Sequence, residues 1–133
     1  MNSTKMNIFR SCIAIVFISI VVYYIYQSII DDKAFKKAGI VTNAMVIKAG
    51  SDYKGRLQLD YFYCVDSIKI NARAVVPELT LSSETKLIGK WVPVMYLKNI
   101  HEKNVLLLSR KSFEIVGLSF PDSLLWIEKF EKR

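Results

Sequence analysis

The hydrophobic pattern divides the chain into two parts. Between Arg10 and Asp31, twenty consecutive residues carry no formal charge, and Ile, Val and Phe occur on every face of a helix. At a rise of about 1.5 Å per residue, such a helix spans roughly 30 Å, the thickness of the hydrocarbon core of a bilayer. A helix of a soluble core would be shorter and would show a polar face. The pattern therefore predicts a transmembrane helix over residues 11–30, after a short tail over residues 1–10.

The ends of this apolar run indicate an uncleaved signal anchor. The run is longer than the 7–15 apolar residues of a secretory signal, and no pair of small residues follows it at a spacing for cleavage. Cleavage is the alternative. Three tyrosines crowd the C-terminal end, where an interfacial aromatic belt is expected. The residues predicted to form the membrane anchor are Ile13, Ile15, Val16, Phe17, Ile18, Ile20, Val21, Val22, Tyr23, Tyr24 and Tyr26.

A change of period follows the anchor. Residues 31–38 predict a helical stalk that Gly39 ends. Residues 40–48 are rich in β-branched side chains and predict a strand. Apolar residues then alternate with polar ones over residues 57–65 and again over residues 68–76, and the two-residue turn Asp66-Ser67 joins the two runs. This pattern predicts a β-hairpin.

The remaining elements are less regular. We expect a short helix capped by Ser82 or Ser83, and then a strand over residues 91–97 that Pro93 confines to a sheet edge or interrupts. Residues 98–104 predict a polar loop. Residues 105–109 and 113–118 predict two further strands.

The last segment, residues 121–133, predicts an amphipathic helix with Asp122 as its cap. Leu124, Ile127 and Phe130 recur at three-residue spacing and would form one apolar stripe. Docking of this stripe onto the sheet is one interpretation. The alternative is that the helix binds a partner or the membrane surface, and the candidate residues for that role are Trp126, Lys129, Lys132 and Arg133.

The expected fold is therefore membrane-anchored and mainly β. One N-terminal transmembrane helix precedes a small β domain over residues 39–120, an antiparallel β-sandwich or a barrel-like domain with a short C-terminal helix. About a hundred residues beyond the anchor are enough for one small domain and not for two.

The charge of the chain bears on which classes of partner it can bind. The formal net charge is +7, an excess that suits anionic lipid headgroups or nucleic acid. The basic residues are scattered and no run of them interleaves with aromatic residues, so a solvated basic surface is the favoured interpretation and no nucleic-acid partner is expected. The expected partners are the lipid bilayer and another membrane or envelope protein. Positive residues flank both ends of the anchor. We expect a single-pass protein of the bacterial inner membrane. The flanking charges do not decide its orientation: an extracytoplasmic β domain is the favoured interpretation, and a cytoplasmic β domain is the alternative.

The sequence shows no reactive constellation. His101 is the only histidine, and a zinc site needs three or four ligands at suitable spacing. Cys64 stands between Tyr63 and Val65, where a half-buried strand residue is expected, although a Cys64–His101 nucleophile pair remains an alternative. The five glycines are too dispersed for a nucleotide fingerprint. No catalytic residue, metal or cofactor is predicted.

A resemblance adds to this reading. The segment after Gly89 places Val92, Val94 and Tyr96 at alternate positions and ends in Lys98-Asn99. With the span and the hairpin, it resembles a loose bacterial family of uncharacterised single- or double-span membrane proteins with a small extramembrane β domain. The resemblance implies no activity and no catalytic residues.

These observations predict a non-enzymatic, membrane-anchored β module that mediates protein–protein interaction as an accessory subunit of an envelope complex. The alternative is a membrane-tethered immunity protein that neutralises a delivered toxin.

Overall fold

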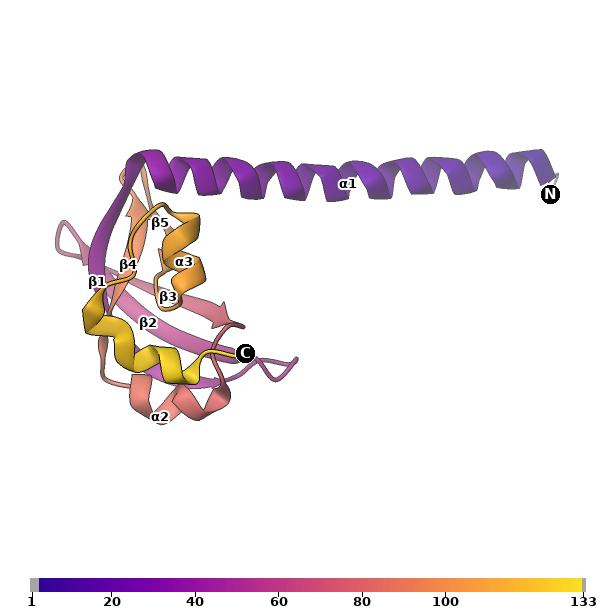
Figure 1. Ribbon diagram of the computed structural model, residues 1–133. Coiled ribbons are helices and arrows are strands. Elements are labelled where there is room, and N and C mark those ends of the chain that lie inside the picture. Colours follow the sequence, from indigo (N-terminus) through magenta and orange to yellow (C-terminus); the bar gives the residue numbers. More distant parts are fainter. Residues whose placement is uncertain (1–2, 133) are drawn as a thin grey trace. The chain divides into compact units, whose positions relative to one another are not determined.

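The computed structural model describes residues 3–132. The chain divides into two compact units, one ending at Lys33 and the other beginning at Ala34. The elements, in chain order, are α1 (Ser3–Ala38), β1 (Gly39–Ser51), β2 (Leu57–Val65), β3 (Ile68–Val76), the 3-10 helix η1 (Leu81–Ser83), α2 (Glu84–Leu87), β4 (Trp91–Leu97), β5 (Ile100–Leu106), α3 (Arg110–Ile115) and the 3-10 helix η2 (Asp122–Phe130) (Figure 1).

Helix α1 is one uninterrupted helix of 36 residues. It therefore includes the part of the expected N-terminal tail that the structure describes, the apolar run and the expected stalk. Its last turn belongs to the second unit, because Phe35 is buried in the core of the β domain. Gly39 ends the helix, as the sequence predicts. A Cβ atom at Gly39 would lie 2.5 Å from the carbonyl oxygen of Phe35, so only glycine fits at this junction.

The second unit is built on a five-stranded antiparallel sheet in the order β3-β2-β1-β4-β5. The predicted hairpin is confirmed. Asp66 and Ser67 form its turn with φ angles of 50° and 67°, the left-handed conformation that a two-residue hairpin turn requires. The face with Leu57, Leu59, Tyr61, Tyr63 and Val65 is buried. Burial of this face fixes the register of β2 in the sheet, because a shift of one residue would expose these side chains to water.

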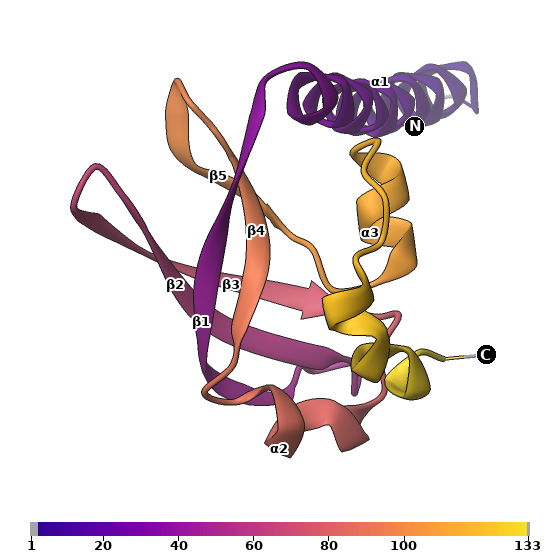
Figure 2. The same cartoon turned by 60° about the vertical axis from the view of Figure 1, so that its left-hand side comes forward.

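Two tyrosines show that the sheet closes on itself. The Tyr61 hydroxyl donates to Oδ1 of Asn104, and the Tyr63 hydroxyl donates to the carbonyl oxygen of His101. Both acceptors lie on β5, which β1 and β4 separate from β2 in the sheet. These bonds therefore cross the interior. The hairpin crosses β1 and β4 at a large angle, and the result is a nearly closed, barrel-like sheet (Figure 2).

Strand β1 carries an irregularity that helps this curvature. Val46 pairs with Tyr61 and Lys48 pairs with Asp60, so Ile47 is an extra residue in the ladder. A β-bulge of this kind bends its strand and increases the local twist. The first strand thus extends beyond its predicted end at Lys48 to Ser51.

The expectation for Pro93 is wrong, since β4 lies inside the sheet. Asn43 of β1 stands opposite Pro93. The Pro93 carbonyl accepts from the Leu107 amide at 3.0 Å, on the side of β5. In a strand, the N–H and C=O of one residue point the same way, so the missing donor faces the end of β5 and leaves the β1–β4 ladder intact.

The segment after β4 also departs from the prediction. Strand β5 begins at Ile100, inside the expected polar loop, and ends at Leu106. The strand expected over residues 113–118 is instead helix α3 followed by a turn. Ser109 and Ser112 form a reciprocal capping box at the start of α3, and Gly117, with φ of 76°, follows its end. Short-range capping therefore outweighs the β-branched composition.

The C-terminal segment is the 3-10 helix η2. Side chains three residues apart lie above one another in a 3-10 helix, so the Leu124–Ile127–Phe130 spacing suits this geometry. Leu124 and Ile127 are buried in the core, as the docking interpretation requires. Asp122 is not the cap, because Pro121 occupies that position. Ser83 precedes α2 but makes no side-chain cap either, since its hydroxyl donates to the Thr80 carbonyl.

Candidate functional site

Cys64 and His101 are not brought together. Tyr63 faces the interior of the sheet, so its neighbour Cys64 faces outward, and Cys64 is exposed rather than half-buried as expected. The His101 ring packs edge-on against Tyr96, which stacks on Tyr63 inside the barrel. The two side chains thus lie on opposite faces. Within residues 3–132 there is also no group of three or more His, Cys, Asp or Glu residues placed to hold a metal ion.

The buried tyrosines are structural. Their hydroxyls are satisfied by Asn104 and by the His101 carbonyl. Burial raises the pKa of the Tyr61 hydroxyl, which therefore stays protonated and acts as a donor. The two side chains stabilise the closure of the barrel and present no group to solvent for chemistry.

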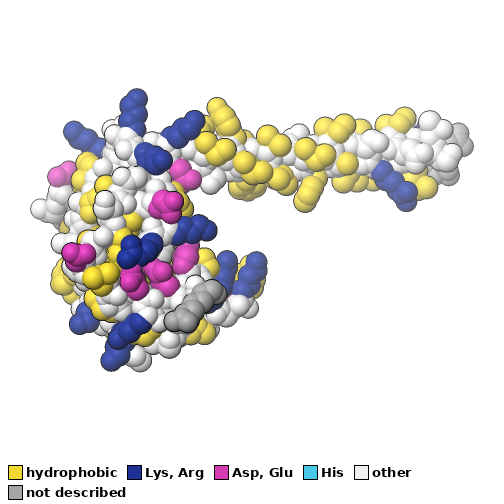
Figure 3. Space-filling view, in the orientation of Figure 1, with side chains coloured by type: hydrophobic (Ala, Val, Ile, Leu, Met, Phe, Trp, Pro, Cys, Tyr) yellow, Lys and Arg dark blue, Asp and Glu magenta, His cyan; other side chains and the backbone are white. Residues whose placement is uncertain are grey.

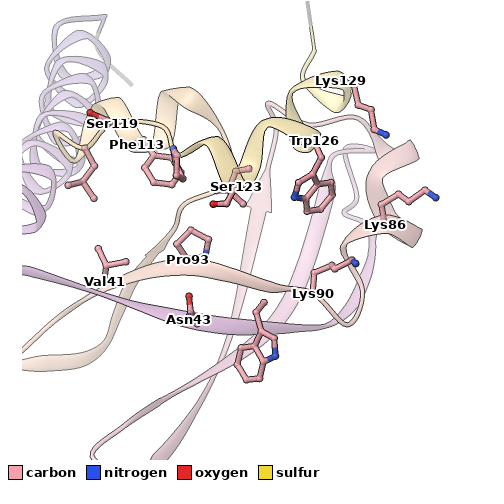
Figure 4. A pocket seen from close by; sticks show the side chains of 14 residues that line it. Val41, Asn43, Lys86, Lys90, Pro93, Phe113, Ser119, Ser123, Trp126 and Lys129 are labelled. Atoms are coloured by element: carbon pink, nitrogen blue, oxygen red, sulfur yellow. The ribbon is translucent and has the colours of Figure 1, made fainter.

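A groove of about 700 Å³ lies beside the first half of β4. One wall comes from the outer face of β1 and β4, with Val41, Asn43, Trp91 and Pro93. The opposite wall is the C-terminal segment from Leu118 to Lys129. Strand β5 ends opposite Val94, so it does not cover this part of β4. Figure 4 shows Trp126 reaching from η2 toward Lys90 across the groove.

Three lysines stand around this groove. Lys86 lies on α2, Lys90 follows α2, and Lys129 lies on η2; all three are exposed. Within the described part of the chain, none of them forms an ion pair. The lining contains no acidic residue. The groove is therefore apolar at its centre and positively charged at its rim.

An apolar row continues from the groove over the outer face of the sheet. Met45 on β1 stands between Phe62 on β2 and Trp91 on β4 in the register of the three strands. The Phe62 and Trp91 rings meet edge-on, with their centroids 6.1 Å apart. The Lys69 ammonium lies 4.4 Å from the Phe62 ring centroid. The side chain of Trp91 is 58% exposed and thus belongs to both surfaces.

Of the C-terminal residues that the sequence predicts as a binding surface, two lie at the groove and one lies outside its lining. Trp126 is half-buried and lines the groove, and Lys129 is exposed at its rim. Lys132 is exposed, and its backbone amide donates to the Glu78 carbonyl at 2.7 Å, away from the groove lining. Arg133 lies outside the described residues.

Sequence reasoning missed Lys86, Lys90, Trp91 and Pro93 as groove residues. One signal was available. The chain has two tryptophans, and both line this groove. Tryptophan is enriched at the energetic centres of protein interfaces.

The predicted anchor residues all lie on α1. From Ile13 to Tyr26 their side chains are exposed, and no residue of the most apolar 18-residue window of the helix is buried. The mean hydropathy of that window is 2.3.

Comparisons with protein-family models, with curated proteins and with solved structures found no match for this chain.

Proposed function

We propose that the chain is a single-pass membrane protein whose β domain binds another protein of the cell envelope, as a non-enzymatic accessory subunit. The observation that carries this proposal is the exposure of α1. From Ile8 to Ile30 its large apolar side chains are exposed, and the described residues bury none of its most apolar 18-residue window. Figure 3 shows hydrophobic side chains along the length of this helix. Burial of each large apolar side chain contributes about 1.5–3 kcal/mol, so this surface needs a non-aqueous environment.

The dimensions of α1 support a bilayer as that environment. The uncharged stretch between Arg10 and Asp31 matches the hydrocarbon thickness of about 30 Å. Tyr23, Tyr24 and Tyr26 lie at one end of the stretch, at the depth where amphipathic rings prefer the headgroup region. A helix in lipid also satisfies its own backbone hydrogen bonds.

A binding role for the β domain is supported by the groove and the apolar row. Exposed apolar patches rimmed by polar residues mark interaction sites, and aromatic residues are enriched at the centres of protein interfaces. The separation of Cys64 from His101 leaves the thiol without an adjacent base, so a binding role suits the domain better than nucleophilic catalysis does.

Cys64 provides a direct test of anchoring and orientation. It is exposed on the β domain, whereas Cys12 lies within the anchor. In a Cys12→Ser variant, a membrane-impermeant maleimide applied to intact spheroplasts should label Cys64 if the β domain is extracytoplasmic. Labelling only after permeabilisation would place the domain in the cytoplasm. Extraction of the full chain by alkali would contradict the anchor itself.

The binding role is tested with a photo-crosslinking residue at Lys90, beside the groove. We expect a discrete adduct with one envelope protein in living cells. The matched control carries the same residue at Tyr53, which is 88% exposed in the loop between β1 and β2. Identical adducts from both positions, or none from Lys90, would contradict the proposal.

A further inference from the structure

We propose that the groove between β4 and η2 binds a short acidic segment of the partner protein, one that also carries an apolar or aromatic side chain. Such a segment would be the partner that the proposed function requires, so its assignment rests on that function. Its chemistry follows from the apolar centre of the groove, from the charge at its rim and from the row that extends it.

The centre of the groove suits an apolar side chain. Pro93, Phe113 and Leu124 line it together with both tryptophans. Its volume of about 700 Å³ falls within the range of roughly 300–1,000 Å³ that is typical of ligand pockets. Phe113 and Leu124 belong to the hydrophobic core, so the floor is rigid and already formed. A preformed site loses little conformational entropy on binding.

The rim suits carboxylates. Lys86, Lys90 and Lys129 come from three different segments, yet all three border one groove without an acidic residue in its lining. Glu128, next to Lys129 in sequence, is occupied by an ion pair with Arg110. Asp122 is exposed at the start of η2 and is not part of the lining. Complementary charge across an interface raises the association rate and excludes partners of the same sign.

The outer apolar row gives the segment room to continue. Trp91 joins the groove to Met45 and Phe62, and Lys69 lies over the Phe62 ring. An extended peptide with alternating acidic and apolar residues would meet apolar surface and lysines along both parts. Asp60, on the same strand as Phe62, is paired with Arg73 and does not oppose this arrangement.

A peptide fits this groove better than a lipid surface does. Side chains that insert into a membrane interface protrude from the protein. Here Leu124 and Phe113 are recessed, and each is only 5% exposed. The concave shape favours an occupant that enters the groove.

Because both tryptophans line the groove, tryptophan fluorescence can be used to measure binding there. The full chain in nanodiscs of zwitterionic lipid is titrated with an acidic peptide that has a central Leu-Phe pair and no tryptophan. We expect a saturable change in tryptophan emission. The matched peptide, in which each acidic residue is replaced by its amide, should bind about tenfold more weakly, the effect expected from loss of several exposed ion pairs. Equal binding of both peptides would overturn the charge assignment.

Two triple variants separate local from general charge effects. Lys86→Gln, Lys90→Gln and Lys129→Gln together should weaken binding of the acidic peptide about tenfold. The control combines Lys54→Gln, Lys98→Gln and Lys111→Gln, three exposed lysines outside the groove lining, and should change binding less than about twofold. Equal losses in the two triples would overturn the proposal.

Titration with anionic phospholipid vesicles tests whether the groove binds lipid headgroups instead. If they change tryptophan emission and the acidic peptide does not, the groove binds lipid headgroups and the proposal is wrong. Failure of the peptide to bind, together with retained labelling of Cys64 and a retained adduct from Lys90, would reject this occupant alone. Loss of the adduct and of the labelling would reject the proposed function itself.

Discussion

Helix α1 and strand β2 are both rich in large apolar side chains, but they use them in opposite ways. From Ile8 to Ile30 of α1 the large apolar residues occur on all faces and are exposed, whereas in β2 the residues at every second position, from Leu57 to Val65, are buried. Alternation matches one face of a sheet and can be satisfied inside the chain. Uniform apolarity cannot be satisfied by one neighbouring face, so it calls for an apolar environment on all sides.

The largest expected effect tests the buried side of this comparison. Leu59→Asp places a carboxylate among Tyr61, Tyr63 and the other inward residues. An unpaired buried charge costs several kcal/mol, which is comparable to the whole stability of about 5–15 kcal/mol of a small domain. We expect loss of the cooperative unfolding transition in urea. Asn71→Asp, on the exposed outer face of β3, should leave the transition within about 0.5 kcal/mol.

Ile127→Ala tests whether η2 completes the core. Ile127 is fully buried, and truncation of such a residue costs about 2–5 kcal/mol. The matched control is Leu125→Ala on the same helix, because Leu125 is 47% exposed and should lose less than about 1 kcal/mol. Equal midpoints of chemical unfolding for the two variants would show that η2 does not contribute to the core.

Ile20→Asp tests the exposed side. An aspartate at the centre of a transmembrane helix costs about 2.5–3.5 kcal/mol on insertion scales. We expect a much smaller membrane-integrated fraction after alkali extraction, with unchanged unfolding of the β domain. An unchanged integrated fraction would mean that α1 is not covered by lipid at this position.

Tyr61→Phe removes one of the two hydroxyl bonds that close the barrel. Because the Asn104 side chain also donates to the Glu102 carbonyl and stays in place, the loss should be about 0.5–1.5 kcal/mol. Chemical unfolding measures this difference. An unchanged free energy of unfolding in Tyr61→Phe would show that the hydrogen bond to Asn104 does not stabilise the closed barrel.

The smallest expected effect is the pH dependence of Asp60. The hydrogen bond from the Arg73 side chain lowers the pKa of the Asp60 carboxyl. The pair therefore stabilises the fold above the unfolded pKa of about 3.9, and this contribution disappears as the pH falls through the lower folded value. Because Arg73 is exposed, it should amount to less than about 1 kcal/mol.

The Asp60→Asn variant tests the contribution of the Asp60–Arg73 pair to stability. The difference in unfolding free energy between the native chain and this variant should shrink between about pH 5 and about pH 2. A difference that grows in acid would contradict the assigned direction of the pKa shift.

Local patterns were sufficient for some elements and not for others. The hairpin could be predicted because burial, alternation and a two-residue turn all agree over residues 57–76. The segment after Leu108 could not, since its β-branched composition conflicts with the capping by Ser109 and the turn at Gly117. Pro93 misled for a similar reason. Pro93 is tolerated inside the sheet because the pairing with β5 ends opposite Val94, and the sequence around Pro93 does not show where that pairing ends.

The candidate site was predictable only in part. Trp126 and Lys129 stood out because they share one short amphipathic segment. Lys86, Lys90 and Trp91 belong to another part of the chain, and only the fold places them on the same groove.

The sequence by itself determined the uncharged apolar run within α1, the hairpin and its inward face, because each depends on contacts between residues close in sequence or on one repeated period. The tertiary structure decided the closure of the barrel through Tyr61 and Tyr63, the separation of Cys64 from His101 and the composition of the groove. These features depend on contacts between residues distant in sequence, which form only when whole elements pack against one another.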